Sequence, residues 1–241
     1  MRRVQTIRGL LPILDADWLE HGEWMPTDGL RHLHTEPESL VQTVVRHLGR
    51  STVSAVQLRC KDTPQRCAAF VALWVDALRR HCPQITIIIN DHVELAVQLA
   101  ADGVHVGQED MPVARCRQLL GADKLVGLST HNLAEVRAAN QAEVDYIGFG
   151  PLFATQTKPD AQAAQGLEQL AAICQLATRP VVAIGGIQAT DMAQVAATGA
   201  TAAAMISGLW GRKENREGWQ QRLQEAEEGW HAGHRSGRYQ V

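Results

Sequence analysis

The stretch Ile85-Thr86-Ile87-Ile88-Ile89-Asn90 decides how the rest of the chain is interpreted. Its apolar residues occupy both odd and even positions, which is typical of a strand buried on both faces of a helix-covered parallel sheet. Directly after it, Val93, Ala96, Val97 and Ala100 follow the i, i+3, i+4, i+7 spacing of an amphipathic helix. A strand that passes straight into a helix predicts a parallel sheet joined by crossover connections.

The same alternation of short apolar runs with helical spacing continues along most of the chain. Asn132 followed by Glu135 resembles a capping box that begins one of these helices. The predicted strands are Leu10–Leu14, Val53–Arg59, Ile85–Asn90, Gly103–Val106, Leu125–Ser129, Tyr146–Phe149, Val181–Ile184 and Ala202–Ile206. A count of eight, with no G-x-G-x-x-G after the first strand, favours a TIM (β/α)8 barrel over an open doubly wound sheet. We expect a single α/β domain over residues 1–241.

Two regions fit this repeat poorly. Residues 15–36 form a connection too long for an ordinary loop between strand and helix. We interpret it as an extended loop after the first strand, acting as a lid, an extra helix or an oligomer contact. Near the other end, periodicity predicts a last helix from Trp219 to Trp230, followed by a polar, flexible tail over 231–241.

Composition excludes several functional classes. The chain has 23 Lys and Arg against 26 Asp and Glu, a formal net charge of −3, so nothing points to nucleic acid or an anionic membrane. The five cysteines show no C-x-x-C pair or zinc-ligand spacing, and their odd number suits free thiols in a reducing compartment. No apolar run is long enough to cross a bilayer, and Pro12 and Asp15 interrupt any signal-peptide core. We therefore expect a cytoplasmic protein.

The end of the second predicted strand carries two cations and an amide. Gln57, Arg59 and Lys61 alternate with Leu58, so a period of two places them on one side. Charges that point into a barrel are costly to bury without an anionic partner. This pattern favours anion binding over an ordinary solvated face.

Two carboxylates lie at the ends of the next two strands. Asp91 follows the third strand and Asp110 follows the fourth. Mg²⁺ takes one or two protein carboxylates and completes its coordination with water and substrate phosphate oxygens. An alternative stays open, because each Asp precedes a helix and could serve only as its N-cap, with Pro112 just inside the second helix.

Three histidines and a hydroxyl are predicted near the same end of the barrel. His92, His105 and His131 have no ligand-like spacing, so structural or hydrogen-bonding roles are favoured over metal binding. Ser129 ends the fifth strand, where its hydroxyl could contact a ligand or cap the next helix.

The later strand ends favour a second anion site. Gly185-Gly186 follows the seventh strand and Ser207-Gly208 the eighth, where barrels of this class bind phosphate through backbone N–H groups. After the sixth strand, Thr155, Thr157 and Lys158 suit an anion through charge-assisted hydrogen bonds, although a polar surface turn is the alternative. Two anion sites together with a metal suggest a reaction that releases pyrophosphate.

Six motifs, taken in order, resemble those of thiamine phosphate synthases. They are Gln57-Leu58-Arg59-x-Lys61, Asn90-Asp91, Gly103-Val104-His105-Val106-Gly107-Gln108-Glu109-Asp110, Gly127-Leu128-Ser129-Thr130-His131, Gly148-Phe149-Gly150-Pro151-Leu152-Phe153-Ala154-Thr155-Gln156-Thr157-Lys158 and Ala183-Ile184-Gly185-Gly186-Ile187. Each motif alone is weak, but the set is specific and spans most of the chain.

The resemblance implies an enzyme that couples a pyrimidine diphosphate to a thiazole phosphate, giving thiamine monophosphate and pyrophosphate with Mg²⁺. It implies that pyrophosphate leaves first and that the thiazole nitrogen captures the pyrimidine cation. The implied pyrimidine-diphosphate ligands are Gln57, Leu58, Arg59, Cys60, Lys61, Asn90, Ser129 and Lys158. The implied metal ligands are Asp91 and Asp110. The implied thiazole-phosphate ligands are Thr155, Gln156, Thr157, Gly186, Ile206 and Ser207. The resemblance implies direct catalytic roles for Arg59, Lys61, Ser129 and Lys158.

Four positions depart from the family pattern: Cys60 where Glu is common, His92 where Arg or Tyr is common, Ala154 where Pro is usual and Gln156 where Asn is usual. None of them removes a metal carboxylate or the loop lysine, so we expect activity to survive. Two alternatives stay open: a related thiazole tautomerase, which needs no metal or diphosphate pocket, and a barrel that binds thiamine phosphates without catalysis. The sequence is also compatible with a homo-oligomer.

Overall fold

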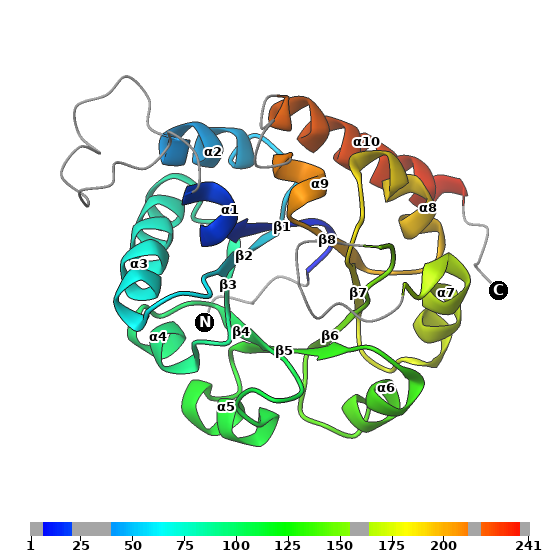
Figure 1. Ribbon diagram of the computed structural model, residues 1–241, viewed down its shortest axis with the longest axis horizontal. Helices are drawn as coiled ribbons and strands as arrows, with labels where there is room; N and C mark the ends of the chain where they lie inside the picture. Colours follow the sequence, from blue (N-terminus) through cyan, green and yellow to red (C-terminus); the bar gives the residue numbers. More distant parts are fainter. Residues whose placement is uncertain (1–6, 21–39, 155–163, 212–217, 237–241) are drawn as a thin grey trace.

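The computed structural model describes residues 7–20, 40–154, 164–211 and 218–236, and these form a closed barrel of parallel strands (Figure 1). Each strand pairs with the next in the sequence, and β8 pairs with β1 to close the ring. The helices surround the strands (Figure 1). The predicted TIM (β/α)8 barrel is therefore confirmed.

The bounds of the elements are as follows. The strands are β1 Gly9–Asp15, β2 Ala55–Arg59, β3 Thr86–Asn90, β4 Gly103–Val106, β5 Leu125–Thr130, β6 Tyr146–Phe149, β7 Val181–Ile184 and β8 Ala202–Met205. The helices are α1 Ala16–Glu20, α2 Leu40–Leu48, α3 Pro64–His81, α4 Val93–Gln98, α5 Val113–Leu120, α6 Leu133–Ala139, α7 Gly166–Leu176, α8 Met192–Ala197, α9 Ser207–Trp210 and α10 Trp219–Ser236, and a 3-10 turn η2 spans Ala189–Asp191. All eight predicted strands are present, with ends that shift by no more than two residues.

Along the strands, the side chains that point into the barrel change from apolar to polar toward the carboxyl ends. On β1, Leu11 and Ile13 belong to the apolar cluster inside the barrel, and Asp15 follows them two residues later. On β2, Ala55 belongs to the same cluster, so the period of two points Gln57 and Arg59 inward as well. The barrel is thus packed with apolar side chains at one end and polar at the other, which is where a site can form.

The outward-facing side chains build the larger core between strands and helices. Leu14, Leu58, Ile87 and Ile89 are fully buried in this layer. The run at 85–89 is therefore buried on both faces, since Ile88 points into the barrel and its neighbours face the helices. Burial on both faces explains why the run does not alternate between apolar and polar residues.

The predicted flexible tail is wrong over residues 231–236, because α10 continues to Ser236. The reason is close packing on α8. A Cβ atom on Gly233 would lie 2.1 Å from the Ala193 carbonyl oxygen, so only glycine allows the two helices to approach this closely. Residues 237–241 lie outside the described part of the chain.

The predicted loop over 15–36 is also corrected at its start, because α1 begins directly after β1 at Ala16. Asp15 Oδ1 accepts a hydrogen bond from the Trp18 N–H (3.1 Å), and the Trp18 indole donates to the Gly211 carbonyl after α9 (2.7 Å). A short helix therefore occupies residues 16–20, and residues 21–39 lie outside the described part of the chain. No helix in the described residues has the length and apolar character needed to span a bilayer.

Candidate active site

A buried ion pair joins the first two strands at the polar end of the barrel. The Arg59 guanidinium pairs with the Asp15 carboxylate, and their side chains are 12% and 2% exposed. The two residues are adjacent in the strand register, Asp15 opposite Arg59. The ion pair holds the guanidinium in one place at the strand end. A guanidinium has five N–H donors, so those not used by Asp15 can still donate to a ligand.

A second ion pair lies at the ends of β2 and β3. The Lys61 ammonium pairs with Asp91 Oδ2, which also accepts a hydrogen bond from Asn90 Nδ2 (2.7 Å). Asp91 has a φ of 62°, a left-handed conformation that Asp adopts more readily than most residues. Burial raises the pKa of the Asp91 carboxyl, an effect that Lys61 opposes and Asp110 increases. Two carboxyl groups therefore face each other closely enough to repel.

Asp110 connects this charged region to the end of β4. Its Oδ2 accepts a hydrogen bond from the Gly107 N–H (2.7 Å), which fixes the turn after the strand. Neither Asp91 nor Asp110 is an N-cap: His92 precedes α4 and Pro112 precedes α5, and neither makes a side-chain capping bond. The N-cap interpretation of both aspartates is wrong, as is the position of Pro112 inside the helix.

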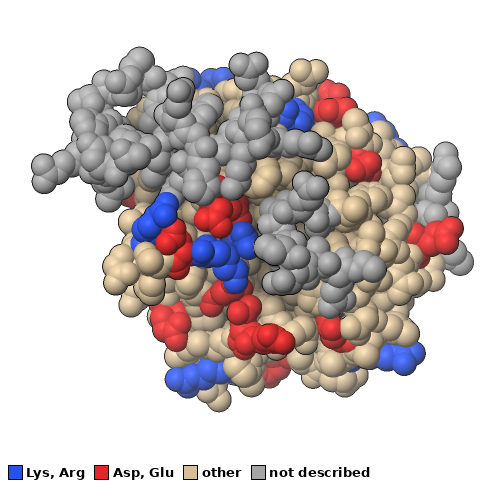
Figure 2. Space-filling model, in the orientation of Figure 1, with Lys and Arg blue, Asp and Glu red and all other residues tan. Residues whose placement is uncertain are grey.

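These two carboxyl groups do not make a metal cage on their own. Among the described residues, no three His, Cys, Asp or Glu side chains are grouped to hold a metal ion. A pair of carboxyls suits a cation that takes most of its ligands from water and phosphate oxygens, which is the preference of Mg²⁺. Figure 2 shows basic and acidic side chains gathered side by side near the middle of this face of the molecule.

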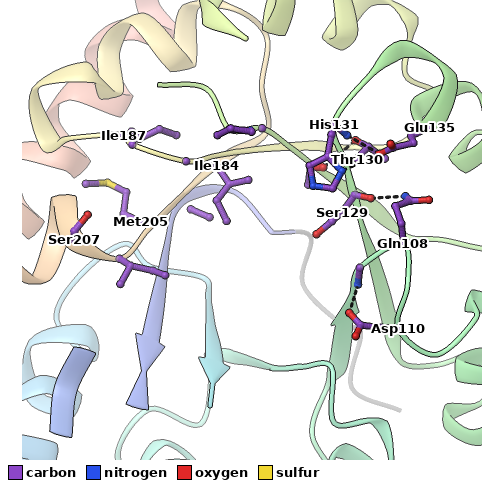
Figure 3. A pocket seen from close by; sticks show the side chains of 18 of the residues that line it. Gln108, Asp110, Ser129, Thr130, His131, Glu135, Ile184, Ile187, Met205 and Ser207 are labelled. Carbon is purple, nitrogen blue, oxygen red and sulfur yellow. Dashed lines mark hydrogen bonds and ion pairs between the residues drawn. The ribbon is translucent and has the colours of Figure 1, made fainter. Parts of the chain in front are cut away.

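A cavity of about 470 Å³ opens beside Asp110, within the size range of small-molecule sites. Figure 3 shows that its two sides differ: Gln108, Ser129, His131 and Glu135 lie on one side, and Ile184, Ile187, Met205 and Ser207 on the other. The cavity therefore brings the polar ends of β4 and β5 opposite the ends of β7 and β8.

Hydrogen bonds hold the polar side of the cavity in place. Gln108 Nε2 donates to the Ser129 carbonyl (2.6 Å), and His131 Nδ1 lies 2.9 Å from Glu135 Oε2. The Asn132 side chain accepts from the Glu135 N–H at the start of α6, which confirms Asn132 as the N-cap, whereas the Glu135 carboxylate accepts from the His131 N–H and so does not complete the predicted capping box. The Ser129 hydroxyl is thus presented from a fixed backbone.

The opposite side of the cavity depends on glycines. Gly186 has a φ of 71°, and a Cβ atom there would lie 2.7 Å from the Ala154 carbonyl oxygen. Only glycine combines this conformation with such a close approach. The bare backbone of the β7 loop, with Ile206 and Ser207 after β8, therefore lines the cavity where a phosphate was predicted.

All three histidines form hydrogen bonds, as predicted. His92 Nε2 lies 3.1 Å from the Cys60 carbonyl, so two of the positions that depart from the family pattern contact each other. His105 lies inside the barrel, with Nδ1 3.0 Å from the Tyr146 hydroxyl and Nε2 2.9 Å from Ser129 Oγ.

Asp15 and Tyr146 were missed as site residues by sequence reasoning. Asp15 had a usable signal, because it is an acid two positions beyond an inward-facing apolar residue at a strand end. Tyr146 had none, since an aromatic residue at the start of a buried strand usually belongs to the core. Tyr146 contacts His105 only because the closed barrel brings their strands together.

The structure divides the predicted site residues into three groups. Asp110, Ser129, Gly186, Ile206 and Ser207 line the cavity. Gln57, Arg59, Lys61, Asn90 and Asp91 lie on the adjoining strand ends. The Leu58 and Cys60 side chains are buried in the core between strands and helices, so only their backbone can contribute. Thr155, Gln156, Thr157 and Lys158 lie outside the described residues.

A parallel (β/α)8 barrel with fixed charges and a glycine-lined cavity at its strand ends defines a phosphate-handling TIM-barrel enzyme. The sequence profile described as thiamine monophosphate synthase matches residues 31–209, which is most of the chain. The chain belongs to the thiamine monophosphate synthase family.

Individual relatives agree. The chain is 37% identical over 207 residues to the thiamine-phosphate synthase of Pelotomaculum thermopropionicum, an alignment that covers 86% of this chain and 90% of that protein. It is 46% identical over 162 residues to the enzyme of Chloroflexus aurantiacus, covering 67% and 73%. Among solved structures, thiamine phosphate pyrophosphorylase from Pyrococcus furiosus superposes with a TM-score of 0.69 at 28% identity, covering 92% of this chain and 96% of that one.

Proposed function

We propose that this chain joins 4-amino-2-methyl-5-(diphosphooxymethyl)pyrimidine to 4-methyl-5-(2-phosphooxyethyl)thiazole, giving thiamine monophosphate and pyrophosphate. The observation that carries the proposal is the meeting, at one end of the barrel, of a charged rim and a glycine-lined cavity. Asp110 lines the cavity together with Gly186 and Ser207, and Arg59, Lys61 and Asp91 lie at the neighbouring strand ends, with Asp91 beside Asp110. One substrate carries a diphosphate and the other a phosphate, so two distinct anion sites match the reaction.

The charged rim suits the leaving diphosphate. Arg59 and Lys61 bring positive charge to the ends of β2, where N–H donors stabilise charge that develops on phosphate oxygens. Ser129 offers a hydroxyl from the cavity side. Loss of pyrophosphate leaves a pyrimidine cation, which the thiazole nitrogen captures. In this proposal the cavity holds the two rings in contact.

Asp91 and Asp110 are the residues that would hold Mg²⁺. The fit rests on the chemistry of the donor set, two carboxyl groups at neighbouring strand ends, and burial together with the nearby Asp110 raises the pKa of Asp91. When bound, Mg²⁺ supplies positive charge beside the diphosphate oxygens. Lys158 is proposed as a further diphosphate ligand by family resemblance.

The test is release of pyrophosphate when both substrates and Mg²⁺ are supplied to the purified chain. We expect release that requires both substrates and stops when a chelator removes the metal. The tautomerase and the non-catalytic binding barrel predict no pyrophosphate under any of these conditions. Binding of both substrates without release would support the binding barrel and contradict the proposal. The same sample run on a sizing column gives the oligomeric state, which the proposal leaves open.

A further inference from the structure

A chain of buried polar side chains crosses the interior of the barrel and ends at Ser129. It runs from Gln57 on β2 through Tyr146 on β6 and His105 on β4 to Ser129 on β5. Gln57, Tyr146 and His105 are 4%, 2% and 8% exposed. Four strands therefore contribute to one hydrogen-bonded path that leads from the apolar interior into the cavity.

The barrel makes room for this path at two glycines. A Cβ atom on Gly127 would lie 2.1 Å from the Tyr146 ring, and one on Gly148 would lie 3.1 Å from His105 Cε1. The side chains of neighbouring strands are thus absent where the phenol and imidazole rings lie. A space made for two polar rings in a buried interior indicates a built network rather than incidental core packing.

The donor and the acceptor of each hydrogen bond can be assigned one after another along the path. Burial raises the pKa of Tyr146, and the hydrogen bond from Gln57 opposes that rise, as an amide N–H does when it donates to a phenol oxygen. The one hydrogen of the Tyr146 hydroxyl is then donated to His105 Nδ1. A neutral imidazole that accepts at Nδ1 carries its hydrogen on Nε2, where Ser129 Oγ lies 2.9 Å away.

We propose that His105 is a positioning residue: it is held by Tyr146 as the neutral Nε2–H tautomer, it donates to Ser129 Oγ, and it so directs the Ser129 hydrogen into the cavity. Ser129 then acts as a hydrogen-bond donor toward the oxygens of the leaving diphosphate. The other tautomer would reverse the path, making Ser129 donate to His105 and present only lone pairs to an anionic substrate. The catalytic consequence rests on the function proposed above, whereas the tautomer does not.

The tautomer can be measured in the free protein by NMR. In the full chain labelled with ¹⁵N-histidine, long-range ¹H–¹⁵N correlations distinguish the two tautomers and the charged form at neutral pH. His105 is assigned by the signal lost in His105→Gln. We expect an unprotonated Nδ1 and a protonated Nε2, and we expect Tyr146→Phe to shift the His105 nitrogen signals. An Nδ1–H tautomer or an imidazolium at neutral pH would overturn the proposal, whatever the enzyme activity.

Two matched variants distinguish the hydrogen bond at Nε2 of His105 from the one at Nδ1. The amide of His105→Gln reaches the position of Nε2 and can still donate to Ser129, whereas the shorter amide of His105→Asn reaches only the position of Nδ1. We expect His105→Asn to lower kcat for pyrophosphate release about tenfold, the effect of one hydrogen bond to a charged group, with KM for the thiazole phosphate unchanged. We expect His105→Gln to retain most of kcat. Equal losses in the two variants would indicate a packing role and contradict the proposal.

A double-mutant comparison tests whether His105 acts through Ser129. If it does, His105→Asn causes no further fall in kcat once Ser129→Ala has removed the hydroxyl. Independent losses that multiply would show that His105 works by another route. Circular dichroism and thermal unfolding of each variant identify any that fail to fold, and for such a variant the tautomer measurement on the unmutated chain still decides the proposal.

Discussion

The two halves of the barrel mouth offer an anion different groups. The ends of β1 to β3, with Asp110 after β4, carry charged side chains in pairs, Arg59 with Asp15 and Lys61 with Asp91. The ends of β7 and β8 carry glycines and bare backbone, notably Gly186. A diphosphate that must leave needs strong, compensated charge, whereas a phosphate that only anchors a ring needs a fitted concavity. The difference therefore matches the different fates of the two groups.

The largest expected effect is on the charged half. Asp91→Asn keeps the size of the side chain and tolerates the left-handed φ of 62°, so the fold should survive. Without the carboxylate we expect kcat for pyrophosphate release to fall about 1000-fold, since a single electrostatic group at a reacting centre contributes on this scale. Asp76→Asn is the control, because Asp76 pairs with Arg80 on an exposed helix face. Near-normal turnover in Asp91→Asn would mean that Asp91 serves only the turn.

The next effect is on stability. Asp15→Asn removes the countercharge of a mostly buried guanidinium, and breaking a buried pair in this way costs about 3 kcal/mol of unfolding free energy. Urea unfolding measures the loss, with Asp76→Asn expected to change stability by less than about 1 kcal/mol. We also expect weaker binding of the pyrimidine diphosphate. If Asp15→Asn were no more costly than the surface control, Arg59 would not depend on Asp15 for its position.

The smallest effect is expected on the glycine half. Gly186→Ala places a methyl group against the Ala154 carbonyl and should raise KM for the thiazole phosphate about tenfold, equivalent to about 1.4 kcal/mol. Gly121→Ala is the matched control, since Gly121 has a φ of 80° but nothing within 4 Å of the added Cβ. Both variants lose stability through backbone strain, and only Gly186→Ala should change KM. A rise in KM for the pyrimidine substrate alone would assign this loop to the other anion.

The fold was predictable because the signal for each unit is local. Each strand is a short apolar run that passes into a helix with its own spacing, and repetition of this unit leaves few topologies. The prediction was wrong where tertiary packing extended an element. Residues 231–236 are polar and contain glycine, yet they stay helical because Gly233 packs tightly on α8. A local reading of composition cannot detect a partner that lies forty residues away.

The sequence predicted those site residues whose place follows from their position at the end of a strand. Gln57, Arg59 and Asp91 follow from strand ends alone, because the carboxyl ends of parallel strands meet at one face. The sequence did not predict that Asp91 pairs with Lys61 instead of capping the helix that follows. An Asp between a strand and a helix is compatible with either role.

The sequence by itself determined the order of strands and helices, the inward phase of Gln57 and Arg59, and the end of the barrel where polar groups collect, because these depend on periodicity within a few residues. Only the tertiary structure decided which polar groups become partners. Asp15 meets Arg59 across 44 residues, and Tyr146 meets His105 across 41. Such contacts are set by strand register and by the glycines that leave space beside them, and these act across the closed barrel rather than along the chain.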